Sequence, residues 1–95
     1  MESAEISEHL VRIYEYVKEG KQWVTTAGIA DRAGVAPRTA RAHALKLVQA
    51  GIFDQMELYP GHRYNLSPKA DKRNKGFLQR LEQALHIINI TRKTP

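Results

Sequence analysis

The central part of the chain, residues 25–66, constrains the fold more than any other stretch. It reads TTAGIADRAGVAPRTARAHALKLVQAGIFDQMELYPGHRYNL. Two short amphipathic segments are separated by Gly34, and Pro37 follows at a position where helices often begin. Alternating apolar and polar residues then flank Tyr59-Pro60-Gly61, a typical turn sequence. This order predicts a helix, a tight turn, a second helix and an antiparallel hairpin.

The same periodicity sets the expected limits of these elements. A helix capped by Thr25 or Thr26 should end near Ala33, and the next should run from Pro37 to about Ala50 and be closed by Gly51. The inward positions of the two helices are expected to be Ile29, Ala30, Ala33, Ala40, Ala44, Leu47 and Val48. The hairpin strands should cover 53–58 and 62–66, and residues 23–24 could add a minor strand.

An amphipathic helix is predicted before this region, from Ser3 to Glu19, with Gly20 in a left-handed conformation after its last turn. Its apolar stripe consists of Ile6, Leu10, Ile13, Tyr14 and Val17. Spacings of three and four place these residues on one face, as expected for a helix that packs on a core.

The C-terminal third combines a basic segment with an apolar repeat. Ser67-Pro68 is a helix-start pair, residues 69–75 are strongly basic, and Gly76 should interrupt the segment. An apolar seam follows, formed by Leu78, Leu81, Leu85 and Ile88. Its spacing suits either packing on the chain's own core or pairing with a second copy. Residues 91–95 are expected to fray. We expect residues 1–68 to form the main unit and residues 69–95 to belong to the same single domain.

The positive charge is unevenly distributed. Residues 1–20 carry five acidic and two basic side chains, whereas residues 21–66 carry six basic and three acidic ones and residues 67–95 carry seven and two. Such a field attracts polyanions. The chain has no cysteine, which excludes disulfides and thiolate metal sites and fits a cytoplasmic protein. No secretory signal and no apolar run of membrane-spanning length is visible, so no membrane partner is expected.

The helix from Pro37 carries side chains suited to the major groove of DNA. Arg38 and Arg41 can each present two donors to guanine or grip a phosphate. Thr39 offers a hydroxyl, Ala42 a small contact for a thymine methyl, and Lys46 a backbone contact. On an isolated helix these charges would more often be merely solvated. The preceding turn and the following hairpin favour the DNA interpretation.

Other candidates surround this helix. Thr25 and Thr26 begin the preceding helix, where hydroxyl and amide groups can hold a phosphate. Tyr59, His62 and Arg63 at the hairpin tip could reach an adjacent minor groove or its phosphates. Tyr59 could equally shield the hairpin, and His62 is equally explained as an exposed turn histidine. The chain's other histidine in this region, at position 43, lies between two helix faces and is expected to be a half-buried packing residue.

Residues 25–66 resemble the winged helix–turn–helix of bacterial transcription regulators. The resemblance rests on TTAGIADRAGVAPRTARAHALKLVQAGIFDQ and on YPGHRYNL as the second half of a wing. It implies a mainly α fold with a small β-hairpin. It also implies base contacts by Arg38, Thr39, Arg41 and Ala42, a phosphate contact by Thr26 and a wing contact by Arg63. Ala36 departs from the family's usual serine cap, and Ala44 from its usual leucine.

Catalysis is not expected, because the four histidines lie on separate elements and no nucleophile or phosphate-binding motif is present. We expect no metal, no cofactor and no small-molecule ligand. The predicted partners are double-stranded DNA and a second copy of the chain, joined through the apolar seam. A protein-interaction module and a nonspecific nucleic-acid binder are the competing functions.

Overall fold

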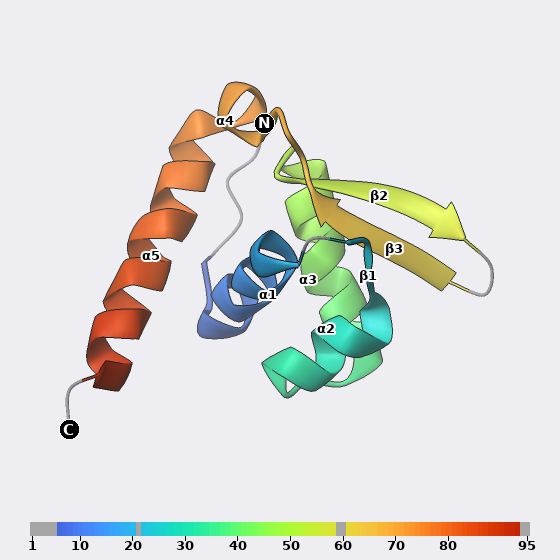
Figure 1. Cartoon of the computed structure of the whole chain (residues 1–95), viewed down its shortest axis with the longest axis horizontal. Coiled ribbons are helices and arrows are strands. Elements are labelled where there is room, and N and C mark those ends of the chain that lie inside the picture. Colours follow the sequence, from blue (N-terminus) through green and yellow to red (C-terminus); the bar gives the residue numbers. More distant parts are fainter. Residues whose placement is uncertain (1–5, 21, 59–60, 94–95) are drawn as a thin grey trace.

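A helix–turn–helix followed by a hairpin forms the middle of the chain, with one helix before it and two after it (Figure 1). The computed structural model describes residues 6–20, 22–58 and 61–93. The elements are α1 (Glu8–Glu19), β1 (Val24–Thr25), α2 (Thr26–Ala33), α3 (Pro37–Gln49), β2 (Phe53–Leu58), β3 (Gly61–Leu66), α4 (Ala70–Arg73) and α5 (Lys75–Lys93). The fold is therefore mainly helical with a small antiparallel sheet, as predicted.

Helix α1 is shorter than predicted, because the chain enters it at Ser7 and not at Ser3. The Ser7 hydroxyl accepts a hydrogen bond from the Leu10 amide at 3.2 Å and so satisfies a first-turn donor. The prediction for Gly20 was also wrong. Its φ of −69° and ψ of 132° are extended, so the chain leaves α1 without a left-handed residue.

The α2–turn–α3 unit follows the sequence prediction closely. Thr25 is the N-cap of α2, and its hydroxyl oxygen accepts from the Gly28 amide at 2.9 Å. Gly34 closes the helix with a φ of 70°, a left-handed conformation that glycine adopts without steric cost. Pro37 begins α3, and Ala36 provides no side-chain cap. Helix α3 ends at Gln49, one residue earlier than predicted.

The sheet has the strand order β1-β3-β2, with both pairs antiparallel. The β2–β3 hairpin pairs Phe53 with Leu66 at its base, and β1 pairs Thr25 with Arg63. The minor strand predicted before α2 thus adds a third strand to the hairpin. The pairing of β1 with β3 places the start of α2 beside the outer part of β3. No local signal in the sequence indicates this proximity.

The C-terminal segment is helical in two pieces separated by Asn74 and not by Gly76. Gly76 lies inside α5, so the predicted interruption was misplaced. The Asn74 side chain donates to the Ala50 carbonyl at 3.2 Å and accepts from the Phe77 amide at 3.4 Å. Helix α5 also continues to Lys93, where fraying had been expected from residue 91. Within the described residues, no helix combines the length and apolar character needed to cross a membrane.

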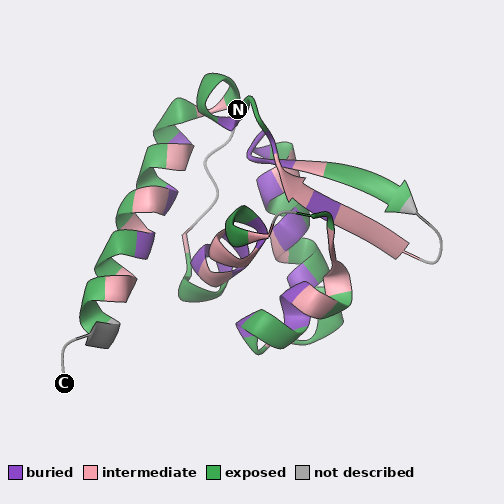
Figure 2. Cartoon of the chain, viewed as in Figure 1, coloured by how far each residue is buried: buried purple, intermediate pink, exposed green. Residues whose placement is uncertain are grey.

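One core joins α1, α2, α3, the sheet and the side of α5 that faces α1 (Figure 2). It includes all the predicted inward residues of α2, together with Ala40, Ala44 and Leu47 of α3. Val11 and Tyr64, each 1% exposed, are buried residues that the predicted stripes did not include.

The apolar seam of α5 packs within the chain. Leu81 and Leu85 belong to the core, and Leu78 and Ile88 pack against it half-buried. Of the two predicted alternatives, these four positions match packing on the chain's own core. The large apolar side chains that α5 leaves exposed lie on another face, at Ile87 and Ile90.

Candidate nucleic-acid interface

The outward face of α3 carries most of the predicted DNA-contacting residues. Each of them is exposed: Arg38, Thr39, Arg41, Ala42 and Lys46. The helix sequence PRTARAHALKLVQ contains no acidic residue, so no carboxylate on the helix itself neutralises these cations. Opposite them, Ala40, Ala44 and Leu47 are fully buried and hold the helix against the core. The structure thus displays a row of donors and small side chains on a helix fixed from behind.

His43 lies between these two faces and is half-buried, as predicted. Its Nδ1 atom is buried and has no hydrogen-bond partner among the described residues. Burial lowers the pKa of His43, and the nearby Lys46 and His9 side chains lower it further. The neutral imidazole is therefore favoured, which suits a packing residue better than a phosphate contact.

A second group of predicted residues lines a shallow cleft between α2 and the sheet. The cleft has a volume of about 190 Å³ and is lined by Thr25, Thr26, Ala27, Gly61, His62 and Arg63. Because helix amides in the first turn lack partners within the helix, the start of α2 presents donors and a partial positive charge here. The Thr25 hydroxyl oxygen already accepts from Gly28, but its proton can still be donated to a ligand.

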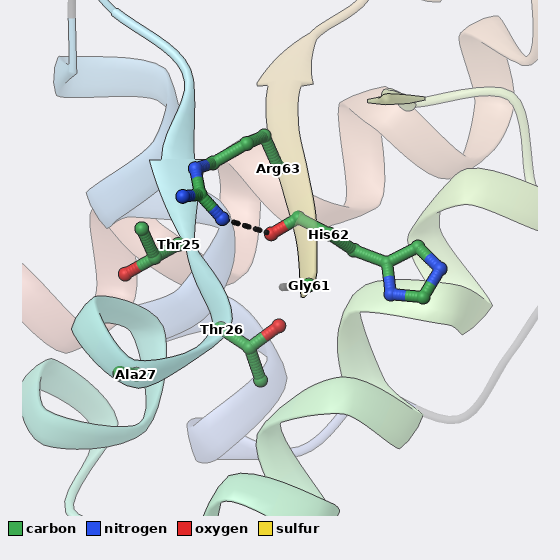
Figure 3. Close-up of a pocket in the computed structure, with 6 residues that line it drawn as sticks. All are labelled: Thr25, Thr26, Ala27, Gly61, His62 and Arg63. Carbon is green, nitrogen blue, oxygen red and sulfur yellow. Dashed lines mark hydrogen bonds between the residues drawn. The ribbon is translucent and has the colours of Figure 1, made fainter. Parts of the chain in front are cut away.

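Arg63 brings a full positive charge to the same cleft. Its guanidinium donates to the His62 carbonyl at 3.3 Å and lies on the same side as the Thr25 side chain (Figure 3). The pairing of Thr25 with Arg63 across β1 and β3 fixes this proximity. The His62 ring points away from the guanidinium, and its Nε2 atom lies 3.6 Å from a Glu57 carboxylate oxygen. Thr25 and Arg63 therefore form one cationic, donor-rich group, whereas the Thr26 side chain extends in the opposite direction to Thr25 and the His62 ring points away from Arg63 (Figure 3).

Two of the residues that line the cleft, Ala27 and Gly61, were not predicted. Neither carries a functional group that would mark it as a candidate in the sequence. Tyr59, the remaining predicted wing residue, lies outside the described residues. The residues of α3 do not line the cleft, so the candidate interface consists of a helix face and a separate clamp.

A further cleft of about 320 Å³ lies among α1, α4 and α5. Its polar lining includes Tyr14 and Lys18, which both donate a hydrogen bond to a carboxylate oxygen of Glu82. The sequence pattern does not indicate this cleft. In the part of the chain that the structure describes, no three histidine, aspartate or glutamate side chains are grouped as a metal site would require.

No protein-family model and no curated protein matches this sequence. Solved structures do match its architecture. A MarR-family transcriptional regulator from Rhodococcus sp. RHA1 superposes with a TM-score of 0.65 and 14% identity, over 94% of this chain and 71% of that one. The chain has a winged-helix fold. YusO from Bacillus subtilis (TM-score 0.60, 15% identity, 95% and 77% covered) has the same arrangement.

A DNA-binding protein from Sulfolobus solfataricus, Sso10a-2, is similar over nearly its whole length. The TM-score is 0.57 at 10% identity, with 93% of this chain and 92% of that chain covered. Identities this low relate the folds and leave the function of this winged helix to be argued from its own residues.

Proposed function

We propose that this winged helix binds double-stranded DNA sequence-specifically and acts as a small transcription regulator or as an accessory protein of a mobile element. The observation that carries the proposal is the exposed, acid-free face of α3 with Arg38, Arg41 and Lys46. An α-helix fits the ~12 Å major groove, where arginine can donate to both guanine acceptors. In this arrangement α3 is the recognition helix.

The cleft beside α2 supplies a backbone clamp in this proposal. Thr25, Thr26 and Arg63 present hydroxyl, amide and guanidinium donors, the groups that most often contact phosphates. Such contacts fix the register of a protein on the duplex without selecting bases. The wing formed by β2 and β3 extends away from the helices, on the flank opposite α5, where it can follow the neighbouring backbone or minor groove (Figure 1).

The structural neighbours support this choice of partner. They include a transcription regulator and a DNA-binding protein, and both share this chain's fold. A regulator of this kind would act in the cytoplasm, on the nucleoid.

We also propose that the protein binds DNA as a homodimer. Leu81 and Leu85 are buried within the chain, so they are not available to a second copy. In this proposal the two copies meet through the exposed face of α5, where Ile87 is 56% exposed. A two-fold dimer would present two recognition helices to half-sites about 34 Å apart. Ile87→Glu should then increase the dissociation constant of the dimer, measured by sedimentation equilibrium. Unchanged self-association would exclude this face as the contact.

Selection from a random duplex pool, followed by affinity measurements over a range of salt concentrations, tests the function. We expect enrichment of one palindromic sequence, with binding that weakens steeply as salt rises. A protein-interaction module would enrich nothing and bind duplex weakly at every salt concentration. A nonspecific binder would show the salt dependence without enrichment.

The role of the recognition helix is tested by Arg41→Ala, with Arg80→Ala on α5 as the matched control. Both side chains are exposed, so each variant removes one positive charge from the surface. Loss of a base contact at Arg41 should cost about 1–3 kcal/mol and relax preference at one base pair. The control should keep the selected sequence. If Arg41→Ala instead weakened binding to all duplexes equally, Arg41 would be a phosphate contact.

A further inference from the structure

Leu45 lies in the middle of the recognition face without a partner in the protein core. It is 42% exposed and belongs neither to the core nor to the half-buried apolar residues that pack against the core. Since residues three and four apart share a helix face, Leu45 is adjacent to both Arg41 and Ala42. Gln49 continues the same exposed row towards the end of α3. At 42% exposure, Leu45 is available for a contact with another molecule.

The distance along the helix places Leu45 within reach of bases. Arg38 and Leu45 are seven residues apart, which corresponds to about 10.5 Å along the axis of an α-helix. The same length of duplex contains about three base pairs. A helix whose first turn contacts bases through Arg38 and Arg41 can therefore keep Leu45 in the groove, one or two base pairs further on.

The chemistry of the groove limits what an apolar side chain can contact there. Base edges in the major groove present donors and acceptors, and the only apolar group they carry is the methyl at C5 of thymine. The outward surface of Ala42 and Leu45 is apolar, and the neighbouring Arg41 and Lys46 are exposed cations that can contact phosphates or guanines on either side. Leu45 is thus an apolar side chain between cations, and it is complementary to a thymine methyl group that lies between the phosphates of the DNA.

We propose that Leu45, together with Ala42, selects a thymine methyl next to the base pair contacted by Arg41. This inference rests on the proposed function, because it requires α3 to enter the major groove of double-stranded DNA. It adds a specificity-determining residue to that function and states a property of the unknown target: each half-site contains a thymine whose methyl group stabilises the complex.

Replacement of thymine by deoxyuridine tests the contact directly, because the two bases pair identically and differ only in the methyl group. In the selected duplex, each thymine of one half-site is replaced in turn. Removing one buried methyl should weaken binding of the unaltered protein about fourfold at a single position. Leu45→Ala should weaken binding to the thymine duplex, and it should discriminate less between the thymine and deoxyuridine duplexes than the unaltered protein does, because Ala42 alone then contacts the methyl group. Leu45→Met, which keeps an apolar side chain, should retain discrimination.

Ile87→Ala provides the matched control, since it truncates an exposed aliphatic residue on α5. It should retain the ratio of thymine to deoxyuridine affinities even if it weakens overall binding. If no duplex is enriched and no salt-sensitive binding occurs, the proposed function and this inference fail together. If one duplex is enriched but deoxyuridine has no effect at any position, or has the same effect on Leu45→Ala, the function stands and the role of Leu45 is refuted. A change in self-association of Leu45→Ala with unchanged discrimination would identify a contact between copies of the chain and also refute it.

Discussion

A buried tyrosine connects the helical body to α5, and its hydroxyl gives a sharp test of how that helix is held. The Tyr14 side chain is 1% exposed, and its hydroxyl donates to a Glu82 carboxylate oxygen at 2.6 Å. Lys18, one turn further along α1, donates to the same carboxylate. One acceptor on α5 therefore receives two donors from α1.

Tyr14→Phe removes the hydroxyl and leaves the ring in place. A hydrogen bond to a charged group contributes about 1.5–3 kcal/mol to stability. The Glu82 side chain is 42% exposed, so water can replace part of the lost contact and Lys18 remains in place. We therefore expect a loss of about 1 kcal/mol, which corresponds to a decrease in Tm of about 4–8 °C for a domain of this size.

The pH dependence distinguishes this bond from ordinary packing. Burial tends to raise the pKa of Glu82, but hydrogen bonds from Lys18 and Tyr14 outweigh it and hold the pKa below its usual value. The resulting stability is present above about pH 4.3 and is lost as the pH falls through the lower folded-state pKa. Burial, the hydrogen bond to Glu82 and its negative charge all raise the pKa of Tyr14. That contribution is present below about pH 10 and declines as the pH rises further.

Urea unfolding of both proteins at one protein concentration, from pH 3 to pH 11, measures the difference. It should be constant near neutrality and shrink at both ends of the range. Tyr16→Phe is the matched control on the same helix, because among the described residues the Tyr16 hydroxyl makes no hydrogen bond. An equal loss in both variants, or a Tyr14→Phe difference that persists unchanged at pH 3, would refute the assignment to the Glu82 hydrogen bond.

Three further substitutions test the local structure around the interface. Thr25→Ala removes the cap on the Gly28 amide and should cost about 1 kcal/mol in urea unfolding, whereas Thr25→Ser should retain most of it. Gly34→Ala has free space for its methyl group but places alanine at a φ of 70°, so it should lower the free energy of unfolding by about 1–2 kcal/mol. Gly34→Asn should lower it less, because asparagine adopts the left-handed conformation more readily. Asn74→Ala loses both the donor to the Ala50 carbonyl and the cap of α5, and it should lower the free energy of unfolding by about 1–2 kcal/mol. Asn74→Asp keeps the acceptor, so its stability should lie between those of Asn74→Ala and the unaltered protein.

Local signals were sufficient for the helix–turn–helix because each of its boundaries depends on one or two neighbouring residues. Thr25 caps a helix through an amide three residues away, and Gly34 ends it through its own backbone conformation. The pairing of Phe53 with Leu66 follows from the length of the hairpin. These features involve short separations along the chain, where propensity and periodicity are informative.

The misplaced break before α5 and the omission of Tyr64 from the core arose where distant parts of the chain decide the local structure. Gly76 is tolerated within the first turn of α5, and the break falls at Asn74, which is tied to Ala50 at the end of α3. Tyr64 becomes part of the core only because the sheet lies against the helices. A periodicity argument cannot include contacts of this kind.

The candidate site divides in the same way. The exposed face of α3 was predictable because a single helix determines which of its residues share a face. The clamp was not predictable as a unit, although Thr25, Thr26 and Arg63 were each candidates. Their proximity depends on the pairing of β1 with β3, and the two strands are separated in the sequence by the whole of α2 and α3.

The two faces of α3 differ in size as well as in polarity, and the difference explains how so small a protein can present a fixed interface. Near the start of the helix the inward residues are Ala40 and Ala44, both fully buried, while Arg38 and Arg41 extend outward. Short inward side chains let α2 pack closely against α3, and closely packed interiors resist displacement. The long side chains therefore project from a backbone that the core already holds in place. In the proposed complex, the entropy lost on binding is mainly that of the outward side chains, because the helix is ordered before DNA arrives.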